Sequence, residues 1–295
     1  MEKFLELLFA GLALGARYAL VALGFVVIFR ATGVINFAQG GFVALGAYLS
    51  YTAINTWGWP FPVAVGVAML ILALVGALVE ASVLRWLIGR PVLTLIMVTI
   101  GILIVMQQIN LQIWGPRLLP LGDPWGLETV DILGVPVRTT NLWTMGLTAA
   151  AVGILFAYFR YARMGLAMRA TALDHEAALA QGISVRRVFA ASWAIAGALA
   201  ALAGVMIAAE SNGVSPTVEL VALAAFPAII LGGLESPGGA VLGGVAIGVA
   251  QQLTAGYQPE FLPVGLSSVV PYIVMVVVLL VRPYGLFGEP EVERV

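Results

Sequence analysis

Long runs without a charged residue divide the sequence into apolar segments. The charge-free stretches are 31–79, 91–116, 139–159, 188–209, 236–259 and 261–281. A helix needs about 20 apolar residues to cross the ~30 Å hydrocarbon core of a bilayer, and these stretches are long enough to supply such helices. The pattern predicts membrane segments at about 7–29, 34–56, 61–88, 92–114, 142–160, 188–209, 217–234, 238–256 and 264–282.

The segment at 34–56 differs from the others because it begins with a polar, glycine-containing stretch. Residues 32–41 read Thr-Gly-Val-Ile-Asn-Phe-Ala-Gln-Gly-Gly, with the amide side chains of Asn36 and Gln39. Irregular backbone persists at membrane depth only where protein or a water-filled cavity surrounds it. We therefore expect a broken or re-entrant segment, eight full crossings and both termini in the cytoplasm. Nine crossings, with the N-terminus outside, are the alternative, and they keep Arg30 on the inner side.

The composition agrees with a membrane protein. Hydrophobic residues make up 61% of the chain and charged residues only 10%, whereas a soluble domain carries roughly 25% charged residues. The predicted fold class is all-α: a polytopic helical bundle that forms one transmembrane domain over 1–295, with about eight transmembrane helices plus the segment near 34–56. Small residues at helical spacing, such as Gly11 with Gly15 and Gly244 with Gly248, predict close helix packing within the chain or between subunits.

Basic residues crowd one loop, which predicts the orientation of the bundle. The arginines of this loop are Arg160, Arg163, Arg169, Arg186 and Arg187. Loops rich in Lys and Arg stay in the cytoplasm, so we place this loop and the C-terminus inside. The opposite loops are acidic, with Asp123, Glu128, Asp131, Glu210, Glu219 and Glu260. Tryptophans at the segment ends predict an outer aromatic belt (Trp57, Trp59, Trp114 and Trp143) and an inner one (Trp86 and Trp193).

Several chemistries are excluded by residue counts. The chain has no cysteine and one histidine, which rules out a disulfide, a thiol nucleophile or a histidine-based metal cluster. Its only lysine is Lys3, so it has no phosphate-binding loop of the G-x-x-x-x-G-K-[ST] type, and we expect no cofactor and no ATP bound by this chain. A net charge of −1 gives no nucleic-acid footprint. We expect no catalytic residue and no enzymatic activity.

The basic loop, about 161–187, also carries a motif. Leu173–Gln181 is rich in helix formers, and Gly182 is suited to end a helix. The sequence Glu176-Ala177-Ala178, followed by Gly182, resembles the E-A-A-x-x-x-G signature of ABC-importer permeases. In that group this element is the coupling helix, which sits in a cleft of the ATPase subunit. A solvated linker is the alternative.

The whole chain resembles the branched-chain amino-acid ABC permeases of the LivH type. The matching segments run from Arg30-Ala-Thr-Gly-Val-Ile-Asn36-Phe37-Ala-Gln39-Gly40, through Arg163-Met-Gly165-Leu-Ala-Met-Arg169 with Asp174 and Gly182, to Arg282-Pro-Tyr-Gly285-Leu-Phe-Gly288. Gly41 departs from the pattern, because this position is often acidic in such proteins, and the departure leaves the transported solute open.

The resemblance implies a five-part importer in the bacterial inner membrane. This chain and a second permease subunit of the LivM type form the pathway, two cytoplasmic ATPase subunits supply the energy, and an extracytoplasmic binding protein delivers the solute. The implied coupling residues are Gly165, Arg169, Asp174, Glu176, Ala177, Ala178 and Gly182. The implied activity is import of branched-chain or related apolar amino acids.

Polar residues at membrane depth are the pathway candidates, together with two of their neighbours. The candidates are Asn36, Phe37, Gln39, Gly40 and Gln108. Asn36 and Gln39 line or gate the path in one interpretation and only cap a helix break in the other. Gln108 belongs to a polar cluster with Gln107, Asn110 and Gln112, which lines a vestibule or contacts interfacial water.

Two charges within apolar segments need partners. Glu80 lies five residues before Arg85 and is expected to pair with it, whereas Arg17 must reach an interface or a carboxylate such as Glu6 or Glu2. Other functions stay open at this point. The same architecture could carry urea or short amides, and an ion-coupled secondary transporter is disfavoured because no carboxylate lies at the middle of a segment. A membrane-embedded enzyme is disfavoured because the chain has no clear acid–base pair.

Overall fold

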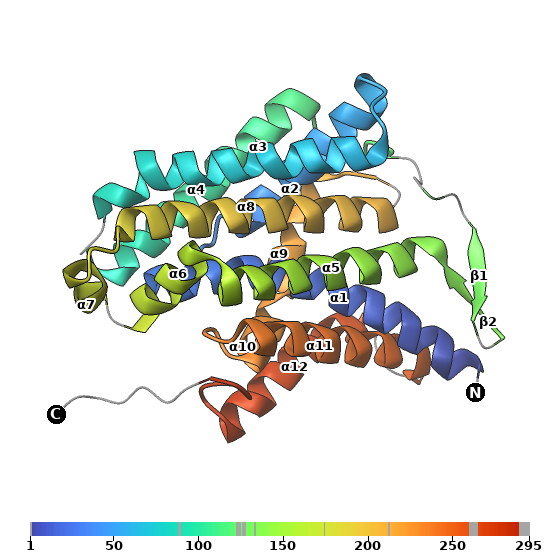
Figure 1. The fold of residues 1–295 in the computed structure, drawn as a ribbon. Coiled ribbons are helices and arrows are strands. Elements are labelled where there is room, and N and C mark those ends of the chain that lie inside the picture. Colours follow the sequence, from blue (N-terminus) through green and yellow to red (C-terminus); the bar gives the residue numbers. More distant parts are fainter. Residues whose placement is uncertain are drawn as a thin grey trace.

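The computed structural model is a helical bundle (Figure 1), and it describes residues 2–87, 90–121, 125, 128–132, 134–173, 175–211, 213–259 and 265–288. The long helices are α1 (Glu2–Thr32), α3 (Phe61–Ser82), α4 (Val92–Trp114), α5 (Thr139–Tyr161), α8 (Val185–Glu210), α11 (Pro237–Tyr257) and α12 (Leu266–Val281). The shorter ones are α2 (Gln39–Tyr51), α6 (Arg163–Leu173), α7 (His175–Ala180), α9 (Leu220–Ala224) and α10 (Phe226–Gly232).

Within the described residues, six helices are long and apolar enough to cross a membrane: α1, α3 with its continuation to Leu87, α4, α5, α8 and α11. The predicted segments at 34–56 and 217–234 are broken, and α12, in the place of the segment at 264–282, is shorter. The helical membrane fold is confirmed, whereas the count of about eight spanning helices is not.

A small β-hairpin was not predicted. Strands β1 (Thr129–Ile132) and β2 (Val135–Arg138) pair antiparallel, with Thr129 opposite Arg138, and Gly134 adopts a φ of +79° in the turn. The positive φ explains the glycine at this position. We call the end of the bundle that carries these strands the hairpin end, and the opposite end, which carries α7, the α7 end (Figure 1).

The first and the last described residues, Glu2 and Gly288, lie at opposite ends of the bundle, so the prediction that the chain begins and ends on one side is wrong. Helix α1 begins at the hairpin end, where Lys3 Nζ lies 5.1 Å from the ring centroid of Tyr257. It ends at the α7 end, where Ala31 packs with Met168 and Val185. The chain described after α12 returns to the α7 end, since Leu286 N donates a 2.8 Å hydrogen bond to Leu231 O.

The reason lies in the broken segment. After α1 the chain runs through an irregular stretch, α2 and a π-helical turn (Thr52–Thr56). Trp114 Nε1 donates a 2.8 Å hydrogen bond to Thr52 Oγ1, and Asn55 Nδ2 donates to Leu121 O. These contacts place the end of the segment beside the end of α4, at the hairpin end. The segment is broken, as predicted, but it traverses the bundle and does not turn back. Arg30 accordingly stays at the α7 end.

The core is formed by α1 and α8 with the helices around them. Residues from Ala19 to Leu23 of α1 are fully buried. Close helix packing within the chain is confirmed, because a Cβ on Gly11 or Gly15 would lie 2.7 or 2.6 Å from Cα atoms of α11. The predicted place of Trp193 in the inner aromatic belt is wrong. Its side chain is 3% exposed and packs edge-on against Phe42 in the core.

Candidate functional site

Asn36 and Gln39 are both fully buried at the break before α2. Asn36 Oδ1 accepts a 3.0 Å hydrogen bond from Ala38 N, and Asn36 Nδ2 donates to Gln39 Oε1 at 3.3 Å. Gln39 Nε2 in turn donates to Ala196 O of α8 at 3.4 Å. The two amides therefore stabilise the irregular backbone and connect it to α8. This geometry accounts for the capping interpretation, and a role in gating stays a prediction.

Phe37 and Gly40 bring the two broken segments together. Phe37 N donates to Thr99 Oγ1 of α4 at 3.3 Å, and its ring stacks on Phe226 of α10 with centroids 5.7 Å apart. A Cβ on Gly40 would lie 2.7 Å from Glu219 O, just before α9. The break at 33–38 thus lies against the broken stretch of residues 216–232. Two irregular segments that meet inside a bundle are suited to rearrange, because few helical hydrogen bonds must break.

Gln108 lies apart from the other four candidates. It is exposed on α4 at a pocket of about 170 Å³. The lining residues are Ala44, Tyr48, Gln107, Gln108, Asn110, Leu111, Pro216 and Glu219. Gln107 Nε2 donates to Glu219 Oε1 at 2.9 Å. Three members of the predicted polar cluster of α4, Gln107, Gln108 and Asn110, therefore border a cavity, whereas Gln112 does not line it. Glu219, which the sequence presents only as one of several acidic residues, lies across from them.

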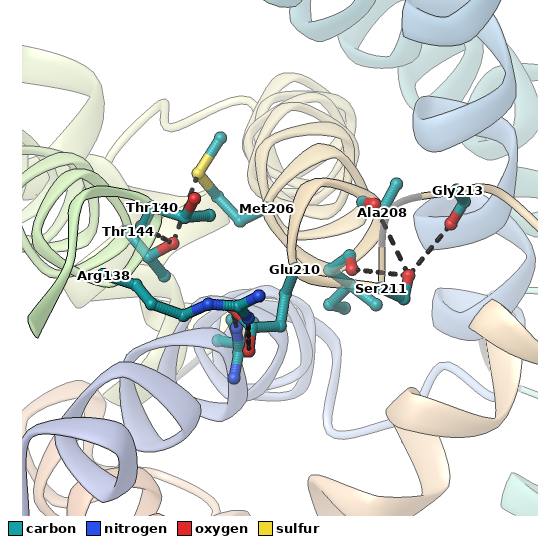
Figure 2. A network of polar contacts seen from close by, with 10 residues as sticks. Arg138, Thr140, Thr144, Met206, Ala208, Glu210, Ser211 and Gly213 are labelled. Carbon is teal, nitrogen blue, oxygen red and sulfur yellow. Dashed lines mark hydrogen bonds and ion pairs between the residues drawn. The ribbon is translucent and has the colours of Figure 1, made fainter. Parts of the chain in front are cut away.

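Both charges within apolar segments are paired. Arg17 is 6% exposed, and its Nη1 lies 3.1 Å from Glu210 Oε2, so the predicted pairing with Glu6 or Glu2 is wrong. Arg138 lies on the other oxygen of Glu210 at 3.6 Å, as Figure 2 shows. Sequence spacing could not identify this partner, because Glu210 follows Arg17 by almost 200 residues. Glu80 pairs with Arg85 at 2.9 Å, as predicted.

The motif of the basic loop lies on α7, at the end of the bundle (Figure 1). Glu176 and Ala177 are exposed, whereas Ala178 is 3% exposed and packs inward. Gly182 has a φ of +77°, and the amide of Ile183 donates to Ala178 O at 3.0 Å, which closes the helix. Gly182 therefore ends the helix as predicted. The helix as described runs over His175–Ala180 and so ends one residue before the predicted Gln181, while Leu173 is the last residue of α6.

The other coupling candidates occupy different environments. A Cβ on Gly165 would meet Tyr158 O, so this glycine lets α6 pack against the end of α5. Arg169 is half-buried and lines a small cavity with Val27 and Phe159, toward the bundle. Asp174 lies outside the described residues. Of the candidates that the structure describes, only Glu176, Ala177 and Gly182 are thus exposed at the end of the bundle.

Residues 7–279 match the family model described as "Branched-chain amino acid transport system / permease component". The chain belongs to this family. The permease protein LivH of the high-affinity branched-chain amino acid transport system of Escherichia coli K12 is 33% identical over 306 residues, which cover 99% of this chain and 98% of LivH. LivM of the same organism is 26% identical over 91% of this chain and 67% of LivM. The predicted resemblance to the LivH type is confirmed.

The family's fold has a solved counterpart. PsaBC from Streptococcus pneumoniae, in complex with Fab, contains a chain that superposes on this one with a TM-score of 0.51 at 17% identity, covering 94% of this chain and 92% of that one. At this level of identity the likeness concerns the fold alone.

Proposed function

We propose that this chain is the LivH-type permease subunit of an ATP-driven importer that carries branched-chain or related apolar amino acids across the bacterial inner membrane. The observation that carries the proposal is the match of residues 7–279 to the permease family, together with 33% identity to LivH over almost the whole chain. The chain itself performs no catalysis. It forms part of the solute pathway and provides a surface that an ATPase subunit binds and moves.

The α7 end faces the cytoplasm in this proposal. Basic residues concentrate at that end, and loops rich in Lys and Arg stay in the cytoplasm. These residues are Arg30, Arg85, Arg90, Arg160, Arg163, Arg169, Arg186, Arg187 and Arg282. The hairpin end, which carries Glu128, Asp131 and Glu210, faces the extracytoplasmic side.

The outward position of α7 supports a coupling role. Leu179 on α7 is 58% exposed, and Leu173, the last residue of α6, is 88% exposed. Exposed leucines beside Glu176 form an amphipathic surface of the kind that a partner protein covers. Each of two ATPase subunits would bind ATP and hold one coupling helix, one from this chain and one from a LivM-type permease subunit. Closure of the ATPase pair would then move α7 and, through α6 and α8, the junction of the broken segments.

The composition of the assembly tests this proposal. Mild extraction of the tagged chain from its native membrane, followed by native mass spectrometry, should give a particle with one copy of this chain, one related permease chain and two ATPase chains. The variant Leu179→Glu should give particles with fewer than two ATPase chains and keep the permease pair, whereas Leu118→Glu, at an exposed position of the hairpin end, should keep both ATPase chains. A particle without ATPase chains in wild type would contradict the proposal.

A further inference from the structure

The pocket between α2, α4 and residues 216–219 contains buried polar groups without partners in the described part of the chain. Asn110 is 5% exposed, and neither its amide nitrogen nor its amide oxygen has a hydrogen-bond partner within the described residues. The Tyr48 hydroxyl, on a side chain that is 1% exposed, likewise has none among them. Buried polar groups in native proteins are nearly always hydrogen-bonded, so exceptions need an explanation.

The surroundings hold these groups in place. The Tyr48 ring stacks on Trp114 with centroids 4.9 Å apart, and Trp114 is itself fixed by its hydrogen bond to Thr52. The Glu219 carboxylate is oriented by the 2.9 Å hydrogen bond from Gln107. The residues that line the pocket therefore carry an oriented carboxylate and, buried in the walls, a hydroxyl and an amide that no described residue engages, and its apolar walls are Ala44, Leu111 and Pro216. Preorganised polar groups in a small apolar-walled cavity are typical of a ligand site.

The charge of the pocket indicates what it binds. Glu219 is the single charged residue among the eight described residues that line it. A ligand that satisfies the pocket brings a positive group with hydrogen-bond donors for Glu219 and an acceptor for Tyr48 Oη and Asn110 Nδ2. An α-amino acid carries both groups on one carbon atom, as an ammonium and a carboxylate. Hydrogen bonds to ionised groups are the strong ones.

We propose that this pocket holds the ammonium and carboxylate groups of the transported amino acid, with Glu219 on the ammonium and with Tyr48 and Asn110 on the carboxylate. The inference rests on the proposed function. The pocket lies next to the junction of the broken segments, since Gly40 of α2 contacts the backbone of Glu219. An amino acid bound here contacts α2 and residues 216–219 together, so the rearrangement of the two broken segments changes the site and releases the solute.

Uptake by the complete reconstituted importer tests the site. The variants Glu219→Gln and Tyr48→Phe should each lower leucine uptake about tenfold or more, because each removes a hydrogen bond to a charged group of the solute. Tyr18→Phe is the matched control, since the Tyr18 hydroxyl donates to Gln251 Oε1 at 2.8 Å, away from the pocket. Glu128→Gln, at an exposed carboxylate of the hairpin end, is the control for the charge. Both controls should transport leucine as wild type does.

The outcomes separate the two claims. If the wild-type importer fails to transport leucine, the proposed function fails. If wild type transports leucine and both pocket variants match it, the function stands and the inference is overturned. Size exclusion shows whether each variant assembles. If the pocket variants and the controls lose assembly equally, labelling of an exposed position tests the inference.

Labelling avoids changes to buried residues. The chain has no cysteine, and Gln108 lies exposed at the rim of the pocket. In a Gln108→Cys importer, a cationic methanethiosulfonate should label this chain, leucine-loaded binding protein with ATP should slow the labelling, and the labelled importer should lose uptake. A Glu128→Cys importer should show neither protection nor loss. Unprotected labelling of the Gln108→Cys importer, with full uptake afterwards, would overturn the inference.

Discussion

Arg17 lies inside an apolar run of α1, so the stability of this region depends on its partner Glu210. The two charges are 3.1 Å apart, with Arg17 almost fully buried and Glu210 partly exposed. We expect Glu210→Gln to lower the free energy of unfolding by about 1–3 kcal/mol, because it leaves Arg17 without this partner. Arg17→Gln should lower it less, because Glu210 keeps Arg138 as a partner. Thermal unfolding in detergent measures the effect. The double variant should lose less than the sum, and strictly additive losses would contradict the ion pair.

Gly204 shows how closely the helices of the core approach one another. A Cβ at this position would meet Val43 O of α2, whereas a Cβ on Gly66 of α3 would have no neighbouring atom within 4 Å. We expect Gly204→Ala to destabilise the protein by about 1–3 kcal/mol through overpacking. Gly66→Ala, the same change at an open helical position, should leave stability unchanged or raise it slightly. Equal unfolding temperatures for the two variants would contradict the packing described.

Sequence reasoning located the residues of the break better than it located their partners. Glycine and amide residues at 32–41 predict irregular backbone, because amide side chains compete for hydrogen bonds that a helix would use. The partner of Arg17 and the role of Glu219 depend on contacts between residues far apart in the chain. A single sequence contains no signal for such contacts.

At the scale of elements, α7 should transmit force through a helix end that only glycine adopts readily. Gly182 has a φ of +77° with open space around it, and Gly115 at the end of α4 has a φ of +78° with equally open space. We expect Gly182→Trp to reduce ATPase association and leucine uptake strongly. Glu176→Arg should act in the same direction by reversing a charge of the docking surface.

Gly115→Trp is the matched control for this experiment, because it carries the same side chain at a similar positive φ at the hairpin end. Both variants carry the strain of a side chain at a positive φ, and a Cβ at either position has no neighbouring atom within 4 Å, so the two should reach the membrane in equal amounts. Wild-type association of the ATPase subunits with the Gly182→Trp permease would refute the coupling assignment.

Long apolar helices were predictable in position, whereas short elements were not. The predicted segment 92–114 coincides with α4, and 238–256 differs from α11 by one residue at each end. Helices α6 and α7 flank Asp174, which lies outside the described residues, and alanine and leucine favour helix in both. Strands β1 and β2 have four residues each. Strands of this length are too short to give a periodic pattern in the sequence.

At the scale of the whole molecule, the two ends of α1 and the position of α7 fix the orientation. The chain lacks cysteine, so single cysteines can report sidedness. We expect Lys3→Cys and Glu128→Cys to react with a membrane-impermeant thiol reagent added outside right-side-out vesicles. Leu179→Cys should react only after the vesicles are opened. Protection of the Lys3→Cys variant in closed vesicles would instead place both termini on the α7 side.

The error about the N-terminus has a physical origin. A broken segment that re-enters and one that traverses have the same local sequence features, because both need glycine and satisfied backbone groups. Arg30 distinguishes the two, since only a traversing segment keeps it at the end where most of the other arginines lie. The charge pattern of the whole chain was thus the better guide to topology.

Uptake into proteoliposomes tests the central claim most directly. This chain is reconstituted with its second permease subunit and both ATPase subunits, and leucine-loaded binding protein is added on the side of the hairpin end. We predict that radiolabelled leucine accumulates only with ATP on the α7 side, that isoleucine and valine compete, and that urea does not. Leucine uptake driven by a proton or sodium gradient without the ATPase subunits, or transport of urea in place of leucine, would contradict the account.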